Sequence, residues 1–163
     1  MAASRRNKRK PGDRVRGGDI MSPAKRSALM SRIRGKNTGP EIAVRHILHR
    51  LGYRYRMHAR DLPGRPDIVF RTRRAAIFVH GCFWHRHSCG LAYMPKTRTA
   101  FWRDKFLQTM RRDRLALRAL RAAGWCVLVI WECQTERSLS RLELRLKRFL
   151  GPPAKAGLNE GSR

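Results

Sequence analysis

Two different spacings of hydrophobic residues divide the chain into predicted helices and predicted strands. Where apolar residues recur every three or four positions, one face of a helix is apolar, and this spacing marks residues 22–33, 40–51, 101–123 and 136–150. Pro23 and Pro40 stand at the first helical position of two segments, and Thr99 is the expected N-cap of the third. Gly52 and Gly124 end two of them. The pattern therefore predicts four helices.

Shorter segments alternate apolar and polar residues or are apolar throughout, which is typical of strands. They are residues 53–58, 67–70, 75–79 and 125–131. A basic turn at 71–74 predicts a hairpin between the second and third strands. We expect the last strand to be central and buried on both faces, with Cys126 a small buried residue on the face of Leu128 and Ile130. From residue 40 on, the order helix, three strands, helix, strand, helix predicts an α/β or α+β fold, a mixed central sheet flanked by helices.

The length of 163 residues suits one domain with one core. Residues 1–20 are basic and rich in Gly and Pro, so we expect a disordered arm that attracts phosphates; its alternative is a dispensable extension. The domain is expected over 21–150 and a flexible tail over 151–163. Neither a membrane span nor a secretory leader is expected. The four Cys should then lie in a reducing compartment such as the cytoplasm, where metal ligation is favoured over disulfides.

Charge points to the kind of partner. The chain has 38 Lys and Arg residues against 11 Asp and Glu, a formal net charge of +27. A GC-rich genome could explain Arg in place of Lys, but it does not explain why acids are so scarce. Nucleic acid is the expected partner, because neutralising phosphates releases condensed counterions.

One short segment concentrates residues that bind soft metals. Cys82, His87 and Cys89 are three potential zinc ligands on one loop, and a closed tetrahedral site needs a fourth. Cys126 and Cys133 compete for that place. We choose Cys133, because it lies at the end of its strand, near the loops. A site so rich in thiols would take Zn²⁺ rather than Mg²⁺.

Carboxylates and histidines nearby suit phosphodiester hydrolysis. Asp67 at the mouth of a strand could hold Mg²⁺; alternatively it only caps a turn. Glu41 is the second candidate, and its alternative is a first-turn acid that favours the helix dipole. His80 and His85 could take a proton from water or steady charge on phosphate oxygens. Their alternatives are a fourth zinc ligand or ordinary packing.

Large aromatic side chains are candidate wedges between base pairs: Phe83, Trp84 and Trp102. Ordinary core packing is the alternative for each. Met30 on the first predicted helix is a weaker candidate of the same kind. Basic residues of the long helix, Arg98 and Lys105 among them, should contact phosphates, with a solvated face as the alternative.

Several strings in this order resemble the very-short-patch-repair (Vsr-type) DNA mismatch endonucleases, bacterial enzymes that nick DNA next to a T·G mismatch. The resemblance runs from about residue 22 to residue 150. The strings are LPGRPD at 62–67, IFVHGCFWH at 77–85 with His87 and Cys89, TRTAFW at 97–102, Arg112-Asp113, and GWCVLVIWEC at 124–133.

The resemblance implies a restriction-endonuclease-like three-layer fold with a structural zinc site. Asp67 and the backbone carbonyl of Val79 would hold catalytic Mg²⁺, His80 and His85 would assist water activation and phosphate stabilisation, and Glu41 would support this network. Zinc would be held by Cys82, His87, Cys89 and Cys133. The wedge would be formed by Phe83, Trp84 and Trp102, with Met30 entering from the minor-groove side.

The expected activity is nicking of one strand 5′ to the thymine of a T·G mismatch, which arises when 5-methylcytosine is deaminated. The partners are then double-stranded DNA with that mismatch and, as candidates, other mismatch-repair proteins, and we expect a nucleoid-associated monomer. A non-catalytic, zinc-stabilised DNA-binding module is one alternative, but it leaves Asp67, His80 and His85 without a purpose. A related nuclease acting on another DNA structure is the other.

Overall fold

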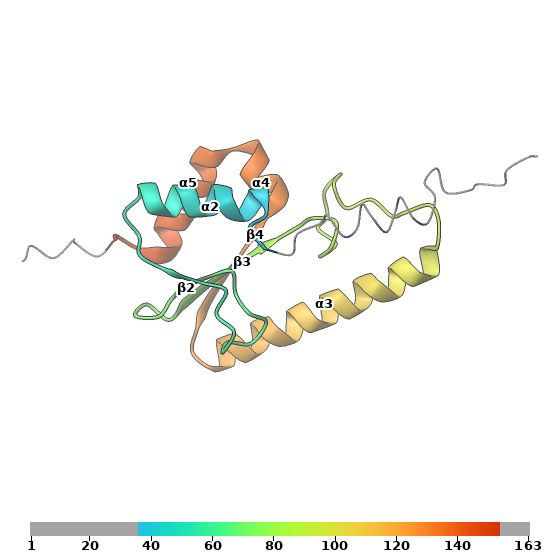
Figure 1. Ribbon diagram of the computed structural model, residues 1–163, viewed down its shortest axis with the longest axis horizontal. Helices are drawn as coiled ribbons and strands as arrows, with labels where there is room; N and C mark the ends of the chain where they lie inside the picture. The colour runs from blue at the N-terminus through green and yellow to red at the C-terminus, as the bar shows by residue number, and fades with distance from the viewer. Residues whose placement is uncertain (1–35, 154–163) are drawn as a thin grey trace, which may run out of the picture. The chain divides into compact units, whose positions relative to one another are not determined.

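The structure of the protein is a computed structural model that describes residues 36–153. The elements follow in the order α2 (Gly39–Arg50), β1 (Arg56–Met57), β2 (Ile68–Phe70), β3 (Ala75–His80), α3 (Thr99–Ala122), β4 (Cys126–Trp131), α4 (Glu132–Arg137) and α5 (Leu139–Leu150) (Figure 1). The expected basic arm, the helix over 22–33 with Met30, and the tail from residue 154 lie outside the described residues.

The first described helix begins as its sequence predicts. The Thr38 side chain accepts a hydrogen bond from the backbone N–H of Glu41, whose side chain accepts in return from the N–H of Thr38, so the two form a capping box. Pro40 stands in the first turn, and Gly52 follows the end of the helix with a φ of +79°. The prediction of a helix over 40–51 is therefore confirmed to within a residue.

The strands of residues 36–153 form one four-stranded mixed sheet in the order β1-β2-β3-β4. The β1–β2 and β2–β3 pairs are antiparallel and the β3–β4 pair is parallel. The predicted hairpin with its turn at 71–74 is confirmed. The strand predicted over 53–58 shrinks to two residues, because the N–H of Tyr53 bonds instead to the carbonyl of Leu48 and closes the preceding helix.

The prediction for the last strand was wrong in two respects. In the sheet that the structure describes, β4 is an edge strand and pairs with β3 alone. Leu128 and Ile130 are buried, but Cys126 is exposed. It is the first residue of the strand, just after the turn at Gly124, and its N–H bonds to the carbonyl of Arg74 in the basic turn. Its position at the mouth of the strand leaves it outside the core.

Helices cover both faces of the sheet (Figure 1). On one face, Leu48 of α2 and Leu146 of α5 pack with Ile68, Ile77 and Ile130 in the larger cluster of buried residues. The opposite face packs against α3 in a smaller cluster: Ala76, Phe78 and Leu120. The sheet between these helices is the predicted mixed sheet flanked by helices.

Two helix boundaries differ from the prediction. Thr99 is the first residue of α3 and not its N-cap; Arg98 precedes the helix in a left-handed conformation, with no side-chain cap. The closing helix, predicted over 136–150, is two helices. Ser138 separates them with an extended backbone, and its hydroxyl accepts a hydrogen bond from the N–H of Arg141, so that Ser138 is the N-cap of α5.

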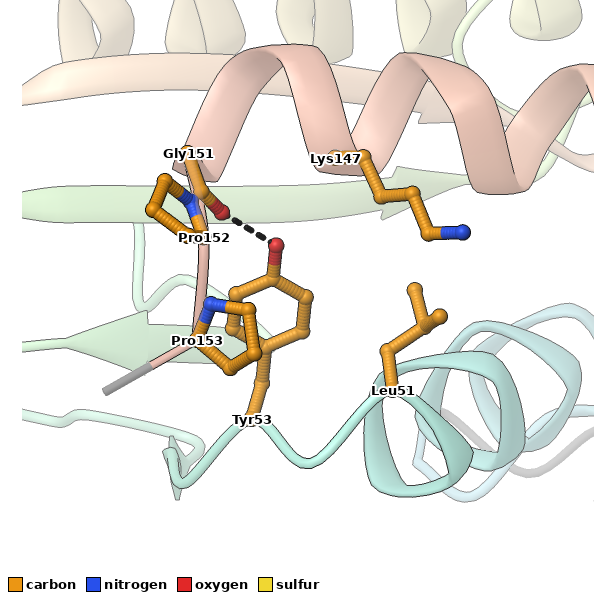
Figure 2. Close-up of a pocket in the computed structure, with 6 residues that line it drawn as sticks. All are labelled: Leu51, Tyr53, Lys147, Gly151, Pro152 and Pro153. Atoms are coloured by element: carbon orange, nitrogen blue, oxygen red, sulfur yellow. Dashed lines mark hydrogen bonds between the residues drawn. The ribbon is translucent and has the colours of Figure 1, made fainter. Parts of the chain in front are cut away.

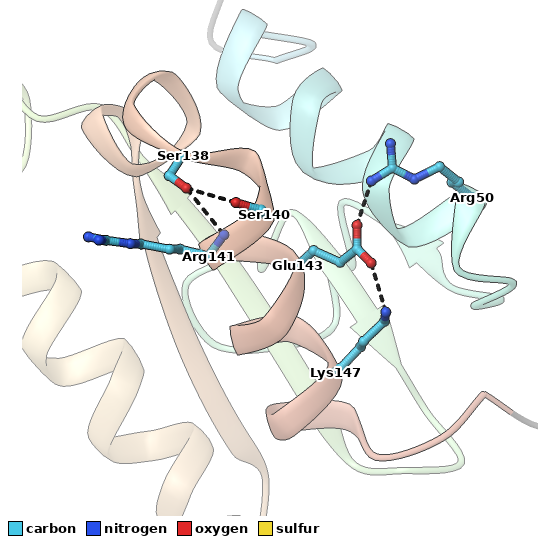
Figure 3. Close-up of polar contacts among 6 residues, drawn as sticks. All are labelled: Arg50, Ser138, Ser140, Arg141, Glu143 and Lys147. Atoms are coloured by element: carbon cyan, nitrogen blue, oxygen red, sulfur yellow. Dashed lines mark hydrogen bonds and ion pairs between the residues drawn. The ribbon is translucent and has the colours of Figure 1, made fainter.

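The end of the domain is held by polar contacts. Glu143 on α5 accepts hydrogen bonds from Arg50 of α2 and from Lys147 (Figure 3). The Tyr53 hydroxyl bonds to the carbonyl of Gly151, beside a pocket lined by Leu51, Tyr53, Lys147, Gly151, Pro152 and Pro153 (Figure 2). The candidate site residues lie elsewhere. Within residues 36–153, no helix is long and apolar enough to cross a membrane.

Candidate active site and metal centres

The pairing of the strands brings residues that are distant in sequence to one end of the sheet. In the parallel register His80 at the end of β3 lies opposite Trp131 at the end of β4, so the chain segments that carry Cys82 and Cys133 leave the sheet side by side. Because β2 runs antiparallel to β3, Asp67 at the beginning of β2 lies at this same end of the sheet. The candidate site residues therefore meet at the carboxyl ends of the two parallel strands, a common place for sites in such sheets.

Asp67 is held across the sheet by a backbone hydrogen bond. Its Oδ2 accepts from the N–H of Val79 at 2.7 Å, so the carboxylate caps a neighbouring strand and not its own turn. Burial raises the pKa of Asp67 to about 6, although the Val79 N–H works in the opposite direction, and the nearby Glu41 raises it further. A divalent cation would relieve both the burial and the repulsion, so the donor set fits a metal ion.

The turn before Asp67 requires glycine. Gly64 has a φ of +73°, and a Cβ added there would lie 2.5 Å from the Cβ of Ala116 on α3. The 62–66 turn is thus packed tightly against α3, which fixes the entry of the chain into β2.

Glu41 has two roles at once. Glu41 is buried, and its carboxylate accepts hydrogen bonds from the Thr38 hydroxyl at 2.9 Å and from the N–H of Asn37 at 3.0 Å. These bonds agree with the alternative interpretation of Glu41 as an acid in the first turn of its helix. The same carboxylate also lies in a group with His58 and Asp67, in which the potential ligand atoms are all within 4.8 Å of one another. The sequence prediction missed His58, which precedes Asp67 by nine residues in no recognisable motif.

The two histidines at this end of the sheet, His80 and His85, are stacked. The rings of His80 and His85 lie 3.7 Å apart between centroids and 8° from parallel. His85 Nδ1 lies 2.5 Å from Oδ2 of Asp113 on α3. Burial, and then the proximity of His85, lower the pKa of His80 to about 4, so His80 is neutral at pH 7.

Asp113 was quoted in the sequence only as part of a motif and was given no role. Burial by itself would raise its pKa, but the hydrogen bond and charge of His85 lower it below the ordinary value, so Asp113 is ionised. The signal available in the sequence was an acid within a helix that is otherwise strongly basic.

A separate group of thiols and an imidazole lies beside the histidines in sequence. The potential ligand atoms of Cys82, His87, Cys89 and Cys133 are all within 4.8 Å of one another. His87 Nδ1 lies 3.8 Å from the Sγ of Cys82 and 3.5 Å from the Sγ of Cys133. Ligands of a tetrahedral Zn²⁺ are about 3.3–3.8 Å apart, given Zn–S near ~2.3 Å and Zn–N near ~2.0 Å, so the group fits a zinc ion.

The surroundings of these thiols also favour a bound cation. Burial raises the pKa of Cys82 to about 12 and raises that of Cys133, whereas a hydrogen bond with His87 lowers the pKa of Cys89 to about 7. Thiolates are stable in so buried a place only with a positive charge among them. The loop is further tied to α4, because the N–H of Cys82 donates to Glu132 at 2.9 Å.

The predicted wedge residues form one aromatic cluster, which we define as Phe83, Trp84, Tyr93, Trp102 and Phe106. Phe83 is its hub, with ring centroids 5.1 Å from Trp84, 5.4 Å from Trp102 and 5.2 Å from Phe106. Phe106 is buried, Phe83, Trp84 and Trp102 are half-buried, and Tyr93 is exposed. The cluster therefore combines packing at its base with aromatic surface at its rim.

Basic side chains flank this cluster. Arg98 and Lys105 are exposed, and the Arg98 guanidinium lies over the exposed ring of Phe101 at 4.8 Å. The guanidinium of Arg86 donates to the carbonyls of Ala92 and Tyr93 and so fastens the loop that follows the thiols.

The chain is similar in sequence to several known proteins that act on DNA. The family model described as DNA mismatch endonuclease Vsr matches residues 18–91. The chain is 49% identical over 134 residues to the type II nicking enzyme V.XorIIP of Xanthomonas oryzae pv. oryzae, covering 82% of this chain and 98% of that protein. It is 42% identical over 115 residues to the DNA mismatch endonuclease Vsr of Escherichia coli, covering 71% and 74%. The type II nicking enzyme V.NmeAIP of Neisseria meningitidis is 40% identical, covering 71% and 83%.

Relatives of this identity and coverage, named as endonucleases and nicking enzymes, make the chain a DNA endonuclease, and the carboxylates and histidines gathered at one end of its sheet fit that class. More particularly, the chain belongs to the DNA mismatch endonuclease Vsr family.

Proposed function

We propose that this endonuclease nicks one strand of double-stranded DNA 5′ to the thymine of a T·G mismatch, by Mg²⁺-dependent phosphodiester hydrolysis. The observation that carries the proposal is the position of Asp67, fixed by the Val79 N–H within reach of a second carboxylate, Glu41. The stacked histidines and their Asp113 partner stand at the same edge. A non-catalytic DNA-binding module would not need this set of groups.

Asp67 and the backbone carbonyl of Val79 would hold Mg²⁺, with Glu41 as support. When bound, the ion would polarise the scissile phosphate and lower the pKa of an attacking water. The raised pKa of Asp67 agrees with a carboxylate that is built to pair with a cation. The Thr38 hydroxyl and the Asn37 N–H keep Glu41 turned toward this place.

The histidines would handle the proton. Hydrogen bonding of His85 Nδ1–H to the ionised Asp113 leaves Nε2 as the free acceptor, and the negative carboxylate stabilises the imidazolium after a proton is taken up. His80 stays neutral at pH 7, its lowered pKa makes it a weak base, and its N–H can donate a hydrogen bond to a phosphate oxygen. We therefore favour His85 as the general base.

The remaining groups would support binding. Zn²⁺ held by the four-residue thiol and imidazole group would brace the loop that carries His80, His85 and the aromatic cluster. Phe83, Trp84 and Trp102, with Met30 from the part of the chain outside the described residues, would open the base stack, which costs least at a T·G pair. Arg98 and Lys105 would contact phosphates.

The proposal includes a restriction-endonuclease-like fold and a monomer that acts on DNA in the bacterial cytoplasm. The hairpin β2–β3, with Asp67 at the start of one strand and Val79 near the end of the other, supports that fold.

A nicking assay tests the proposal. The full chain is incubated with matched 5′-labelled duplexes that carry T·G, A·T or G·C at one position, with Mg²⁺ or with EDTA. We expect a nick 5′ to the thymine only in the T·G duplex and only with Mg²⁺. Asp67→Ala should abolish nicking and retain binding, whereas the exposed Asp104→Ala on α3 should nick normally. Equal nicking of all three duplexes would show a nuclease of another specificity, and no nicking at all would favour the binding module.

A further inference from the structure

His58 occupies an unusual place beside the proposed magnesium centre. It follows β1 directly, and its backbone N–H donates to the carbonyl of Asp67 at 3.0 Å, so the pairing of β1 with β2 sets it opposite that aspartate. A ring nitrogen of His58 lies within 4.8 Å of the carboxylate oxygens of both Glu41 and Asp67. The half-buried imidazole thus faces two acids from two other elements.

The backbone of His58 has a φ of +49°, in the left-handed region, where His is found more often than most residues other than Gly, Asn and Asp. Within residues 36–153 neither ring nitrogen has a hydrogen-bonding partner. A half-buried imidazole whose nitrogen lies within 4.8 Å of two carboxylates, and is hydrogen-bonded to neither, is placed to share a cation with them.

We propose that His58 is a direct ligand of the divalent metal centre, which makes that centre a mixed site of two carboxylates and one imidazole. This inference rests on the proposed function, because it extends the site of Asp67 and Glu41. The two acids supply the hard oxygen ligands that Mg²⁺ prefers, and the imidazole nitrogen is the borderline ligand that later divalent metals prefer.

A selectivity follows from the added nitrogen. Mg²⁺ gains little from exchanging a water for an imidazole, whereas the affinity of a nitrogen-containing site rises from Mn²⁺ through Co²⁺. The centre should therefore bind Mn²⁺ and Co²⁺ more tightly than Mg²⁺, and His58 should account for much of the difference. The thiol-rich group should keep its zinc when Mn²⁺ is added, because Mn²⁺ binds more weakly than Zn²⁺ to sites of this kind.

Mn²⁺ binding to the zinc-loaded full chain tests the proposal directly. Free Mn²⁺ is followed by electron paramagnetic resonance to obtain its Kd, and electron spin echo modulation detects an imidazole ¹⁴N bound to the ion. The variants are His58→Asn, which suits the left-handed backbone, and His49→Asn, a matched change at an exposed helical histidine. Asp67→Asn shows which site is being titrated, and circular dichroism checks that each variant is folded.

We expect the ¹⁴N signal in the wild type and in His49→Asn, and its loss in His58→Asn. Removing even an outer ligand partner costs roughly 10–100-fold in affinity, so the Kd for Mn²⁺ should rise at least about tenfold. The Kd for Mg²⁺, measured by competition, should change less. A wild type without a ¹⁴N signal, a signal that persists in His58→Asn, or Mn²⁺ binding that ignores Asp67→Asn would each overturn the proposal. Nicking of the T·G duplex by the wild type is read separately, so a failure of the proposed function leaves this result interpretable.

Discussion

His85 Nδ1 lies 2.5 Å from Oδ2 of Asp113, and this bond joins the loop after β3 to the middle of α3. Both side chains are about one-fifth exposed, so the pair is partly shielded from water. The hydrogen bond fixes the ring orientation and places the proton on Nδ1. Asp113 therefore acts through His85, as a positioning residue for the proposed base.

Replacing this partner should damage the chemistry more than the binding. In Asp113→Asn the amide no longer stabilises a protonated His85, so we expect kcat for nicking to fall on the order of 10²-fold, within the usual range for general-base catalysis. The Kd for the T·G duplex should stay within about threefold. Single-turnover nicking and a binding titration measure the two quantities.

The control is Asp104→Asn, which removes an exposed acid from the same helix. A loss of charge alone would affect both variants equally. Full activity of Asp113→Asn would remove the aspartate from the mechanism.

Removal of the zinc proposed for the thiol group should lower thermal stability. A zinc site contributes its binding free energy to folding, so stripping the metal with 1,10-phenanthroline should lower Tm by roughly 10 °C or more for a domain of this size. Cys133→Ser should behave in the same way without chelator. Cys126→Ser is the matched control, because Cys126 is exposed and outside the group. If Cys133→Ser melted with the wild type and still bound one zinc, the group would have no structural role.

Local signals made much of the fold predictable. The capping box at Thr38 and Glu41 fixes the start of α2, and Gly124, with a φ of +75°, ends α3. The edge position of β4 was not predictable, because the apolar pattern of a strand reports that its faces are buried and does not report how many strands pair with it. The break at Ser138 was missed, although Ser is a preferred N-cap, because the apolar spacing continues across it.

The candidate site was predictable where it depended on strand ends. Cys133 was preferred because it follows a strand, and the structure brings it to Cys82 through the parallel pairing. Asp113 and His58 were not assigned, because their place depends on which face of α3 meets the histidine loop and on the β1–β2 register. Neither is encoded in the spacing of residues along the chain.

The ion pairs of Glu143 give a pH dependence of stability. Hydrogen bonds from Lys147, and then from Arg50, lower the pKa of Glu143 below its ordinary value of 4.5. A carboxyl with a depressed pKa in the folded state stabilises above its unfolded pKa, and this contribution is lost as the pH falls through the folded pKa. The Tm of Glu143→Gln should therefore lie slightly below that of the wild type at pH 7, and the difference should shrink as the pH falls below about 4.5 and vanish below the lowered pKa of the folded state.

In that contact between α2 and α5 the Arg50 side chain is exposed and the Glu143 side chain is about one-quarter exposed, so 1 M salt should reduce the difference at pH 7. The exposed Glu136→Gln serves as control. A constant difference between pH 7 and pH 3 would assign the effect to packing of the side chain and not to its charge.

The aromatic cluster allows core packing and wedging to be separated by two substitutions. Phe83 contacts Trp84, Tyr93, Trp102 and Phe106, so Phe83→Ala should destabilise the domain by about 2–4 kcal/mol. Trp84 is half-buried and has fewer ring contacts, with Phe83 and Trp102. Loss of one base-stacking side chain costs ~1–3 kcal/mol, so Trp84→Ala should weaken binding of the T·G duplex roughly tenfold while Tm changes less than in Phe83→Ala.

The control is Leu107→Ala, which removes an exposed apolar side chain from α3 and should change neither stability nor DNA binding. Denaturant unfolding and fluorescence anisotropy with T·G and A·T duplexes measure both effects; if Trp84→Ala bound the T·G duplex as tightly as the wild type does, Trp84 would belong to the core and not to the wedge.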